Sequence, residues 1–289
     1  MNVEGWSPRN DMQVIYTGHG FHFYKGAPLK YWFIYYNVEK WLSRYTDKLV
    51  TINHEDYEYA KKFKAKKAYM IDGIGVDGKR FEISLSDDEK AALKKELSSI
   101  KEGFTINESD IVVTYVAELI PRKNQDLLIN AMKDICNSDN QIAHNIKVLL
   151  VGTGILKEHY ENRIKELGLE SNVLLTGYRK DVPKIFRITD IGISTSKQEG
   201  LGLNLIESLL SDVPVIGSKV RGHDEIIADG ENGLFFKSQD VNDLEEKIIK
   251  LSEDKELRNK MKKNAKESVR RFLLESSLKE MIDIYNDKV

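Results

Sequence analysis

The stretch IVVTYVAEL (111–119) is a short run of apolar and β-branched residues, and four similar runs follow it. They are IKVLLVG (146–152), NVLLTG (172–177), IGISTS (191–196) and VPVIGS (213–218). Amphipathic stretches with helical spacing lie between them, at 124–137, 155–168, 181–188 and 201–211. Strands that alternate with helices predict βαβ units and a mostly parallel sheet, which binds ligands at the carboxyl ends of its strands. This half of the chain is therefore predicted to be an α/β domain of the Rossmann type.

The first hundred residues contain fewer strand-like runs. Three are expected, in VIYTGHG (14–20), KLVTIN (48–53) and AYMIDGIGVD (68–77). Helices are expected over the aromatic-rich residues 29–45, over the Lys/Glu-rich residues 86–101, and from Val241 to the end. Three strands are too few for a complete doubly wound domain, and the composition changes over residues 78–105. We therefore predict a partial N-terminal domain (1–85), a complete Rossmann-like domain (86–273) and a C-terminal helix (274–289) that crosses back to the N-terminal part.

The composition is that of an ordinary globular protein. The 289 residues are 41% hydrophobic and 31% charged, with a formal net charge of −2. This charge gives no overall attraction to nucleic acid, so we expect no nucleic-acid partner. No run approaches the ~20 apolar residues that span a bilayer. The start, MNVEGWSPRNDMQ, lacks the apolar core of a signal peptide, and the single cysteine, Cys136, suits a reducing compartment. We therefore expect a cytoplasmic protein.

The segment EGLGLNLIE (199–207) contains the residues most suited to bind a ligand. It follows a predicted strand and opens a predicted helix, whose free amides and positive dipole end can hold a diphosphate. Glu199 and Glu207 lie at most about 12 Å apart at a rise of ~1.5 Å per residue. That span suits two carboxylates that accept hydrogen bonds from the sugar and the ribose of a nucleotide sugar. Taken alone, the same residues equally describe a buried strand-to-helix turn with a solvated second glutamate.

The segment and its neighbours resemble a known family. The string EGLGLNLIE is similar to the E-x7-E motif of retaining glycosyltransferases with the GT-B fold. Among these, the chain looks like the bacterial glycosyltransferase group 1 (family 4) enzymes of capsular and exopolysaccharide synthesis. Other segments occur in the family's order: VIYTGHGFHFYKGAP, YMIDGIGVD, VAELIPRKNQDLLINAM, VGTG, LTGYRKDVPKIF and PVIGSKVRGHDEIIADGENGLFF. The resemblance covers roughly residues 14–275. It implies a GT-B-like α/β fold with an acceptor-side domain at 1–85 and a nucleotide-sugar-binding domain at 86–273.

The resemblance also implies roles for individual residues. Glu199 would contact donor-sugar hydroxyls, Glu207 the ribose hydroxyls, and Lys123 would neutralise the leaving diphosphate. Further donor-binding residues are implied at Gly200, Leu201, Gly202, Leu203, Gly152, Gly154, Tyr178 and Arg179. A histidine in the loop after the first strand lines the family's cleft near the reacting sugar, which makes His19 a candidate catalytic residue and His22 a weaker one.

Some of these assignments keep an alternative. Many relatives have a Gly-Arg pair five residues before the lysine, and this chain has Ala117-Glu118 there. Since an acid cannot bind phosphate in that way, either Arg122 takes over the role or Lys123 acts alone. Arg179 equally fits a solvated surface charge, and a lone histidine such as His19 is often structural.

The implied function is retaining, metal-independent transfer of a hexosyl group in polysaccharide biosynthesis. The donor would be a nucleoside diphosphate sugar, by family habit a UDP-sugar, and the acceptor a glycan or lipid-linked glycan. The chain has no Asp-x-Asp, the usual carboxylate pair for a metal-bound donor, and we expect neither metal nor cofactor. Because the first domain starts late, the alternative is a truncated, catalytically silent nucleotide-sugar-binding remnant. A dinucleotide-binding Rossmann protein is disfavoured, because VGTGILKE lacks the third glycine of that fingerprint.

The N-terminal part raises two questions about partners. The predicted helix over 29–45 mixes Trp and Tyr with Lys and Arg, which suits peripheral contact with a membrane interface. Alternatively, its aromatic residues fill the small N-terminal core. A three-stranded remnant also exposes sheet edges, so association with another chain that covers it is a further expectation. If the helix binds lipid, the protein would lie at the inner face of the membrane.

Overall fold

The computed structural model describes residues 12–287. The chain forms two compact units: the larger consists of Gly75–Leu274, and the smaller of the residues before and after that range. The first boundary thus lies at Gly75, whereas the change in composition had suggested a position after residue 85. The difference has a local cause. Val76 exchanges backbone hydrogen bonds with Phe272 and Leu274, at 2.9 Å each, and so pairs with the end of the larger unit.

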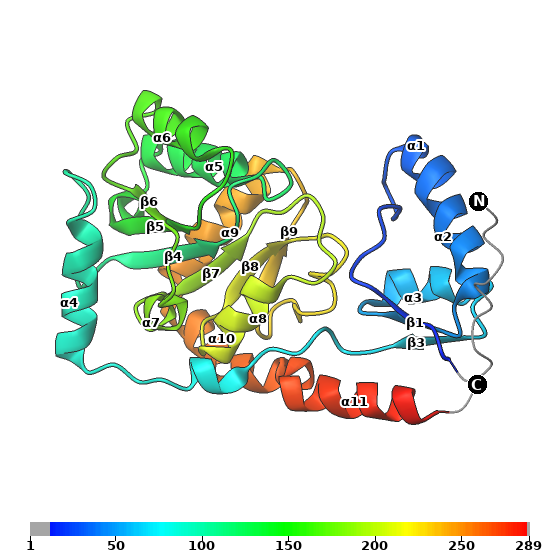
Figure 1. The fold of residues 1–289 in the computed structure, drawn as a ribbon. Coiled ribbons are helices and arrows are strands. Elements are labelled where there is room, and N and C mark those ends of the chain that lie inside the picture. The colour runs from blue at the N-terminus through cyan, green and yellow to red at the C-terminus, as the bar shows by residue number, and fades with distance from the viewer. Residues whose placement is uncertain (1–11, 288–289) are drawn as a thin grey trace, which may run out of the picture. The chain divides into compact units, whose positions relative to one another are not determined.

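The larger unit is built on a six-stranded parallel sheet with strand order β6-β5-β4-β7-β8-β9 (Figure 1). The strands are β4 (Ile111–Val116), β5 (Ile146–Val151), β6 (Val173–Gly177), β7 (Ile191–Ser194), β8 (Val215–Ser218) and β9 (Gly233–Phe236). The chain runs outward from β4 to β6, then returns to β7 and continues outward on the other side. The strand order therefore reverses between β4 and β7. In open parallel sheets, ligands bind at such a switch point, beyond the carboxyl ends of the strands.

Helices cover both faces of this sheet (Figure 1). They are α4 (Asp87–Ser98), α5 (Gln125–Asn137), α6 (Lys157–Glu166), α7 (Val182–Phe186), α8 (Leu203–Leu210), α9 (Val241–Glu253) and α10 (Lys255–Ser268). Short 3-10 turns are η3 (Gly78–Phe81), η4 (Gln141–Asn145) and η5 (Arg270–Phe272). In β5, Val148 and Leu150 pack into one core with α5 and α9, while Leu149 and Val151 pack into a second core with α4. Because both faces are buried, the strands are continuous apolar runs in the sequence.

The smaller unit contains a three-stranded parallel sheet with the order β1-β2-β3. Its strands are β1 (Ile15–Gly18), β2 (Lys48–Thr51) and β3 (Lys67–Met70). Its helical elements are α1 (Leu29–Tyr31), the π-helical turn η1 (Trp32–Tyr36), α2 (Asn37–Leu42), the 3-10 turn η2 (Ser43–Tyr45), α3 (His54–Ala60) and α11 (Leu274–Asn286).

A buried lysine joins α11 to this small sheet. Lys48 of β2 is fully buried, and its ammonium group donates hydrogen bonds to the carbonyl oxygens of Ile284 (2.5 Å) and Tyr285 (3.4 Å). These carbonyls belong to the last turn of α11, where they lack helical partners and lie at the negative end of the helix dipole. Just beyond the helix, Asp287 accepts hydrogen bonds from Lys67 at 3.0 Å and from Tyr69. The sheet and the last helix are thus held together by buried and half-buried polar contacts.

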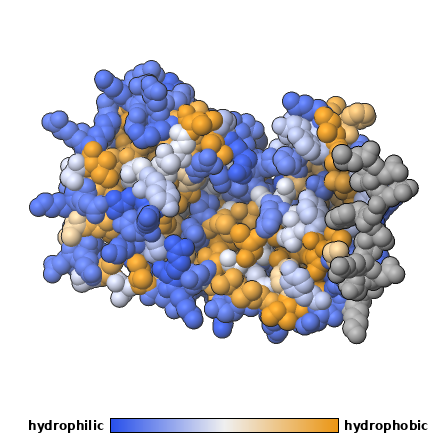
Figure 2. All heavy atoms as spheres, in the orientation of Figure 1, coloured by the Kyte–Doolittle hydropathy of each residue, from blue (hydrophilic) through white to orange (hydrophobic). Residues whose placement is uncertain are grey.

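The aromatic helix expected over 29–45 forms α1, η1, α2 and η2 in succession. One face packs into the core of the smaller unit, where Trp32 and Tyr36 contact the buried ring of Phe23. The other face is apolar and exposed: Leu29 is 86% and Phe33 79% accessible, and Figure 2 shows hydrophobic residues over α1 and α2. Core packing therefore explains one face, and membrane contact by the other stays a prediction. No helix within residues 12–287 is long and apolar enough to cross a bilayer.

Candidate functional site

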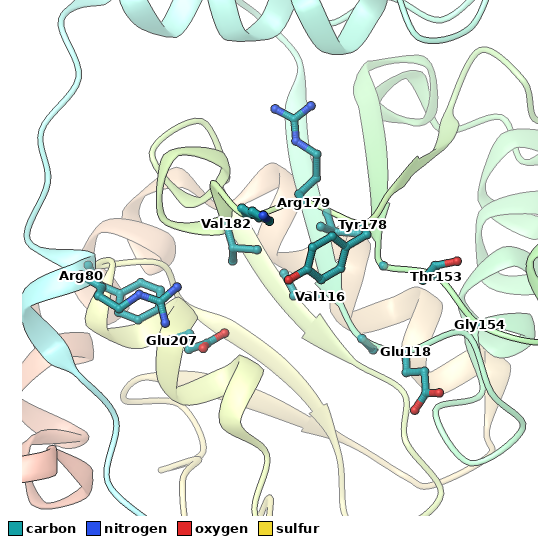
Figure 3. Close-up of a pocket in the computed structure, with 14 residues that line it drawn as sticks. Arg80, Val116, Glu118, Thr153, Gly154, Tyr178, Arg179, Val182 and Glu207 are labelled. Carbon is teal, nitrogen blue, oxygen red and sulfur yellow. The ribbon is translucent and has the colours of Figure 1, made fainter.

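A cavity of about 720 Å³ opens beyond the carboxyl ends of β4, β5 and β6, beside the switch point (Figure 3). Loops after these strands line it together with α7, α8 and η3. The lining residues are Arg80, Phe81, Val116, Ala117, Glu118, Val151, Gly152, Thr153, Gly154, Tyr178, Arg179, Lys180, Val182 and Glu207. Its size, its mixed polar and apolar walls and its place in the sheet are typical of a small-molecule site.

Two glycines let the loops after β4 and β5 close on each other at the cavity wall. The amide of Leu119 donates a hydrogen bond to the carbonyl oxygen of Thr153 at 2.9 Å. A Cβ added to Gly152 would lie 2.0 Å from the carbonyl oxygen of Ala117, and one added to Gly154 would lie 2.5 Å from that of Leu119. Both distances are far below van der Waals contact. The Gly-x-Gly pair is therefore required by the close approach of two backbones.

Glu207 of α8 points into the cavity, on the side where Arg80 of η3 reaches in (Figure 3). Burial raises the pKa of the Glu207 carboxyl to about 7, and the charge of Arg80 opposes this shift only in part. Among the residues that the structure describes, none donates a hydrogen bond to this carboxylate. The carboxylate is partly buried and faces the cavity, so a ligand that supplies hydroxyl groups there would provide the missing donors. Arg80 was not foreseen, because it precedes the predicted Rossmann-like domain.

Glu199 lies in the loop after β7 and is only 4% exposed. Its carboxylate accepts hydrogen bonds from Lys123, from Arg122 at 2.9 Å and from the Ser196 hydroxyl at 2.6 Å. Burial alone would raise the pKa of Glu199, but the charge and hydrogen bond of Lys123 and the hydrogen bond of Ser196 hold it below its ordinary value. Glu199 is therefore an ionised carboxylate with two cations at the switch point between β4 and β7.

A network of hydroxyl groups fixes the two loops that carry these charges. The buried Tyr115 hydroxyl of β4 lies 2.8 Å from the Lys123 carbonyl oxygen and 2.9 Å from the Ser196 hydroxyl. Burial raises the pKa of Tyr115 to about 12, so the hydroxyl stays neutral. The Thr195 hydroxyl also donates to the Asn124 carbonyl oxygen at 2.8 Å. The ends of β4 and β7 are thus held together beneath the charged groups.

The loop after β8 adds a histidine to which the sequence analysis assigned no role. His223 is fully buried, its Nδ1 lies 2.8 Å from the Ser218 carbonyl oxygen, and its Nε2 has no partner among the described residues. Burial lowers the pKa of His223, so the ring is neutral with Nδ1 as the donor. A Cβ added to Gly202 would lie 2.9 Å from the imidazole Cδ2. His223 therefore packs against the Gly-Leu-Gly turn that precedes α8.

Tyr178 and Arg179 follow β6 but differ in their surroundings. The Tyr178 ring is 71% exposed and stands at the cavity (Figure 3). The Arg179 guanidinium instead binds Asp181 through two hydrogen bonds, at 2.8 and 2.7 Å, and Glu96 at 2.7 Å. In Figure 3 it points toward α4 and away from Glu207. The Arg179 side chain therefore binds Asp181 and Glu96 of α4, whereas its backbone and the Tyr178 ring can contact a ligand in the cavity.

The other predicted site residues are found in two places. Glu118 is an exposed residue at the cavity wall. Arg122 and Lys123 both bind the Glu199 carboxylate, so Arg122 lies beside Lys123, and its role in place of the missing arginine stays a prediction. Gly200, Leu201, Gly202 and Leu203 form the turn into α8. No side chain caps the start of that helix, and the amides of Leu203 and Leu205 donate to the carbonyl oxygens of Leu201 (3.1 Å) and Gly202 (2.9 Å). Diphosphate binding by this turn therefore stays a prediction.

His19 follows β1 in the smaller unit, with an exposed side chain. Its catalytic role stays a prediction. Within residues 12–287 there is no cluster of three or more histidine, cysteine or acidic side chains that could hold a metal ion.

Comparisons with known proteins agree on one family. The family model described as "Glycosyl transferases group 1" matches residues 98–268. The putative glycosyltransferase EpsD of Bacillus subtilis (strain 168) is 37% identical over 280 residues, which are 96% of this chain and 70% of that protein. The poly(ribitol-phosphate) alpha-N-acetylglucosaminyltransferase of Staphylococcus aureus (strain COL) is 25% identical over 81% of this chain, which spans about half (49%) of that protein.

Solved structures show the same fold. Anabaena Alr3699/HepE in complex with UDP superimposes with a TM-score of 0.78 at 20% identity, covering 94% of this chain and 72% of that one. The α/β fold with parallel sheets is therefore GT-B-like, as the sequence predicted.

Proposed function

Because the chain belongs to the glycosyl transferases group 1 family, we propose that it transfers a sugar from a UDP-sugar to a glycan or lipid-linked acceptor in polysaccharide biosynthesis. EpsD is named as a putative glycosyltransferase, the S. aureus relative is named for transfer to poly(ribitol-phosphate), and HepE is described in complex with UDP. These names support the class of reaction, a glycan-type acceptor and the uridine nucleotide.

The observation that carries the proposal is the arrangement of charges along the carboxyl edge of the sheet. The cavity presents Tyr178 beyond β6, Gly152 and Gly154 beyond β5, and the Glu207 carboxylate on α8. Beyond β4 and β7 follow Lys123, Arg122 and Glu199. An aromatic ring for the base, a carboxylate for the ribose and cations for the diphosphate fit a nucleoside diphosphate sugar.

In the proposed reaction the bond between the anomeric carbon and the diphosphate oxygen breaks, and the acceptor hydroxyl oxygen bonds to the same carbon from the same face. The hydroxyl proton passes to the departing diphosphate. Lys123 and Arg122 stabilise the charge that develops on the leaving group. Glu199 accepts hydrogen bonds from the sugar hydroxyls. This route gives retention of configuration and uses neither a metal nor a cofactor. His19 would line the acceptor side.

Calorimetry with UDP, GDP and ADP tests the donor site, and incubation with UDP-sugars and a lipid-linked glycan tests transfer. NMR of the product's anomeric proton reports the configuration. We expect UDP to bind most tightly and Glu199→Ala to abolish transfer. Binding without transfer by the wild-type chain would identify a silent nucleotide-sugar-binding protein, and unaltered transfer by Glu199→Ala would refute the site.

The exposed apolar face of α1 and α2 supports a second part of the proposal, peripheral contact with the inner face of the membrane. Lys30, Lys40 and Arg44 lie along the same segment and would meet anionic headgroups. Flotation with liposomes that contain anionic lipid tests this contact. Flotation that is unchanged by Phe33→Ser would contradict a role for the exposed face.

A further inference from the structure

The Glu199 carboxylate binds Lys123 and Arg122, the two cations that the proposed function assigns to the diphosphate. Lys123 binds one of its oxygens and Arg122 the other, at 2.9 Å for Arg122. The carboxylate side chain is 5% exposed, whereas the Arg122 side chain is 46% exposed. In this arrangement an anion of the protein itself neutralises the cations.

Glu199 is held in place through both its backbone and its carboxylate. Its carbonyl oxygen accepts a hydrogen bond from Arg221 at 3.2 Å, and Ser196, which binds its carboxylate, is anchored by the buried Tyr115 hydroxyl. The Arg122 guanidinium also donates to the Gln198 carbonyl oxygen at 3.2 Å, but its side chain is long and half-exposed, so another rotamer can direct it toward a ligand. When a nucleotide sugar enters, the cations can turn toward its diphosphate while Glu199 stays in place.

Moving the cations leaves a buried carboxylate in need of new donors. A nucleotide sugar brings sugar hydroxyls, which can donate to that carboxylate, whereas a nucleoside diphosphate brings none. We propose that Glu199 is an internal anion that holds Lys123 and Arg122 until sugar hydroxyls replace them, so that the site binds a nucleotide sugar in preference to the nucleoside diphosphate product. This inference rests on the proposed function and adds product release to it.

Two opposite effects follow for Glu199→Gln, which keeps the shape and removes the charge. UDP no longer competes with an anion for the cations, so UDP binds about tenfold more tightly, as expected for removal of one unfavourable buried charge contact. A UDP-sugar is likewise freed from competition with the Glu199 carboxylate for the cations, but it loses the hydrogen bonds that its sugar hydroxyls donate to that carboxylate. The ratio of the UDP-sugar affinity to the UDP affinity therefore falls.

Calorimetry on the full chain measures both affinities, with UDP and with UDP-glucose, UDP-galactose and UDP-N-acetylglucosamine as probes. Glu207→Gln is the matched control in the same motif. Within residues 12–287 no cation is bonded to Glu207, and Glu207 would face a part of the ligand common to UDP and UDP-sugars, so this variant lowers both affinities alike. Glu102→Gln, on the exposed loop after α4, controls for the loss of a surface charge and changes neither.

A second variant keeps the test valid if Glu199→Gln fails to fold. With UDP bound, Arg122 remains on Glu199, so Arg122→Gln changes the UDP affinity less than about twofold. With a UDP-sugar bound, Arg122 has turned to the diphosphate, so the same variant weakens binding about tenfold.

Tighter UDP binding by Glu199→Gln, or a selective loss of UDP-sugar binding in Arg122→Gln, supports the inference. Unchanged or weaker UDP binding by a folded Glu199→Gln overturns it while leaving the proposed function intact. Failure of the wild-type chain to bind UDP or any UDP-sugar overturns the proposed function and the inference with it.

Discussion

Glu207 gives the sharpest link between the stability of this protein and its proposed ligand site. Its carboxyl has a pKa of about 7 in the folded chain and an ordinary value of 4.5. The folded state therefore holds this proton over a range of pH in which the unfolded state has lost it. As pH rises from about 4.5 to about 7, the free energy of unfolding falls, and above pH 7 the full cost of the buried charge is present.

The magnitude follows from the two pKa values. At about 1.36 kcal/mol per tenfold change in proton affinity, the buried charge costs about 3 kcal/mol at pH 8 and less than about 0.5 kcal/mol at pH 4.5. Glu207→Gln removes the charge and nearly keeps the shape. We therefore expect the variant to be more stable than the wild type by up to about 3 kcal/mol at pH 8, with little gain at pH 4.5.

Thermal denaturation of the wild type and of Glu207→Gln at both pH values measures this difference. For a unit of this size, each kcal/mol shifts Tm by about 2–4 °C. Glu102→Gln, an exposed carboxylate outside any helix, serves as the control and should shift Tm at neither pH. The reasoning is refuted if Glu207→Gln is no more stable than the wild type at pH 8, or gains equally at both pH values. The same variant should bind UDP at least about tenfold more weakly, so stability and binding move in opposite directions.

Two further predictions concern the walls of the cavity, and a third concerns metal ions. Gly154→Ala should lower the free energy of unfolding by about 3 kcal/mol in chemical denaturation, because the added Cβ would meet the backbone of Leu119. The control Gly168→Ala, whose backbone is strained but whose Cβ would lie in open space, should lower it by about 1 kcal/mol. Equal losses would show that the loops after β4 and β5 can separate. Tyr178→Ala should weaken UDP binding about fivefold in calorimetry, and Tyr178→Phe should weaken it much less. Arg179→Gln should change the UDP affinity less than twofold but lower Tm. A larger loss of UDP affinity in Arg179→Gln than in Tyr178→Ala would place the base on Arg179. Chelation with EDTA should leave the rate of sugar transfer unchanged, and a loss restored by a divalent cation would contradict metal independence.

Periodicity was sufficient to predict most of the larger unit. The five apolar runs that begin at Ile111 became β4 to β8, since a strand buried on both faces needs side chains that only a continuous apolar run provides. The sixth strand, β9, was not predicted. Its four residues, GLFF, are too short for a periodic pattern, and they form a strand because they pair with β8. Helix α3 was missed for a similar reason, since its sequence HEDYEYA has little apolar periodicity.

The candidate site shows more clearly which residues the sequence could not predict. Glu199, Lys123 and Glu207 were predicted because they lie in segments with a family-like order. Arg80 and His223 were not, because their importance comes from what they face. Arg80 reaches the cavity from a turn far from Glu207 in the sequence, and His223 packs against Gly202 from the next strand's loop. Conversely, Arg179 matched a binding segment, yet its charge is used by Asp181 and Glu96.

The bond between Lys48 and the end of α11 has a consequence for the order of folding during synthesis. The three strands of the smaller unit leave the ribosome before the six-stranded sheet, but the carbonyl groups that accept hydrogen bonds from the buried ammonium belong to α11, which follows that sheet in the chain. All segments of the six-stranded sheet emerge before them. The larger unit can therefore fold while translation continues, and the small sheet must wait for α11 before its lysine can be buried.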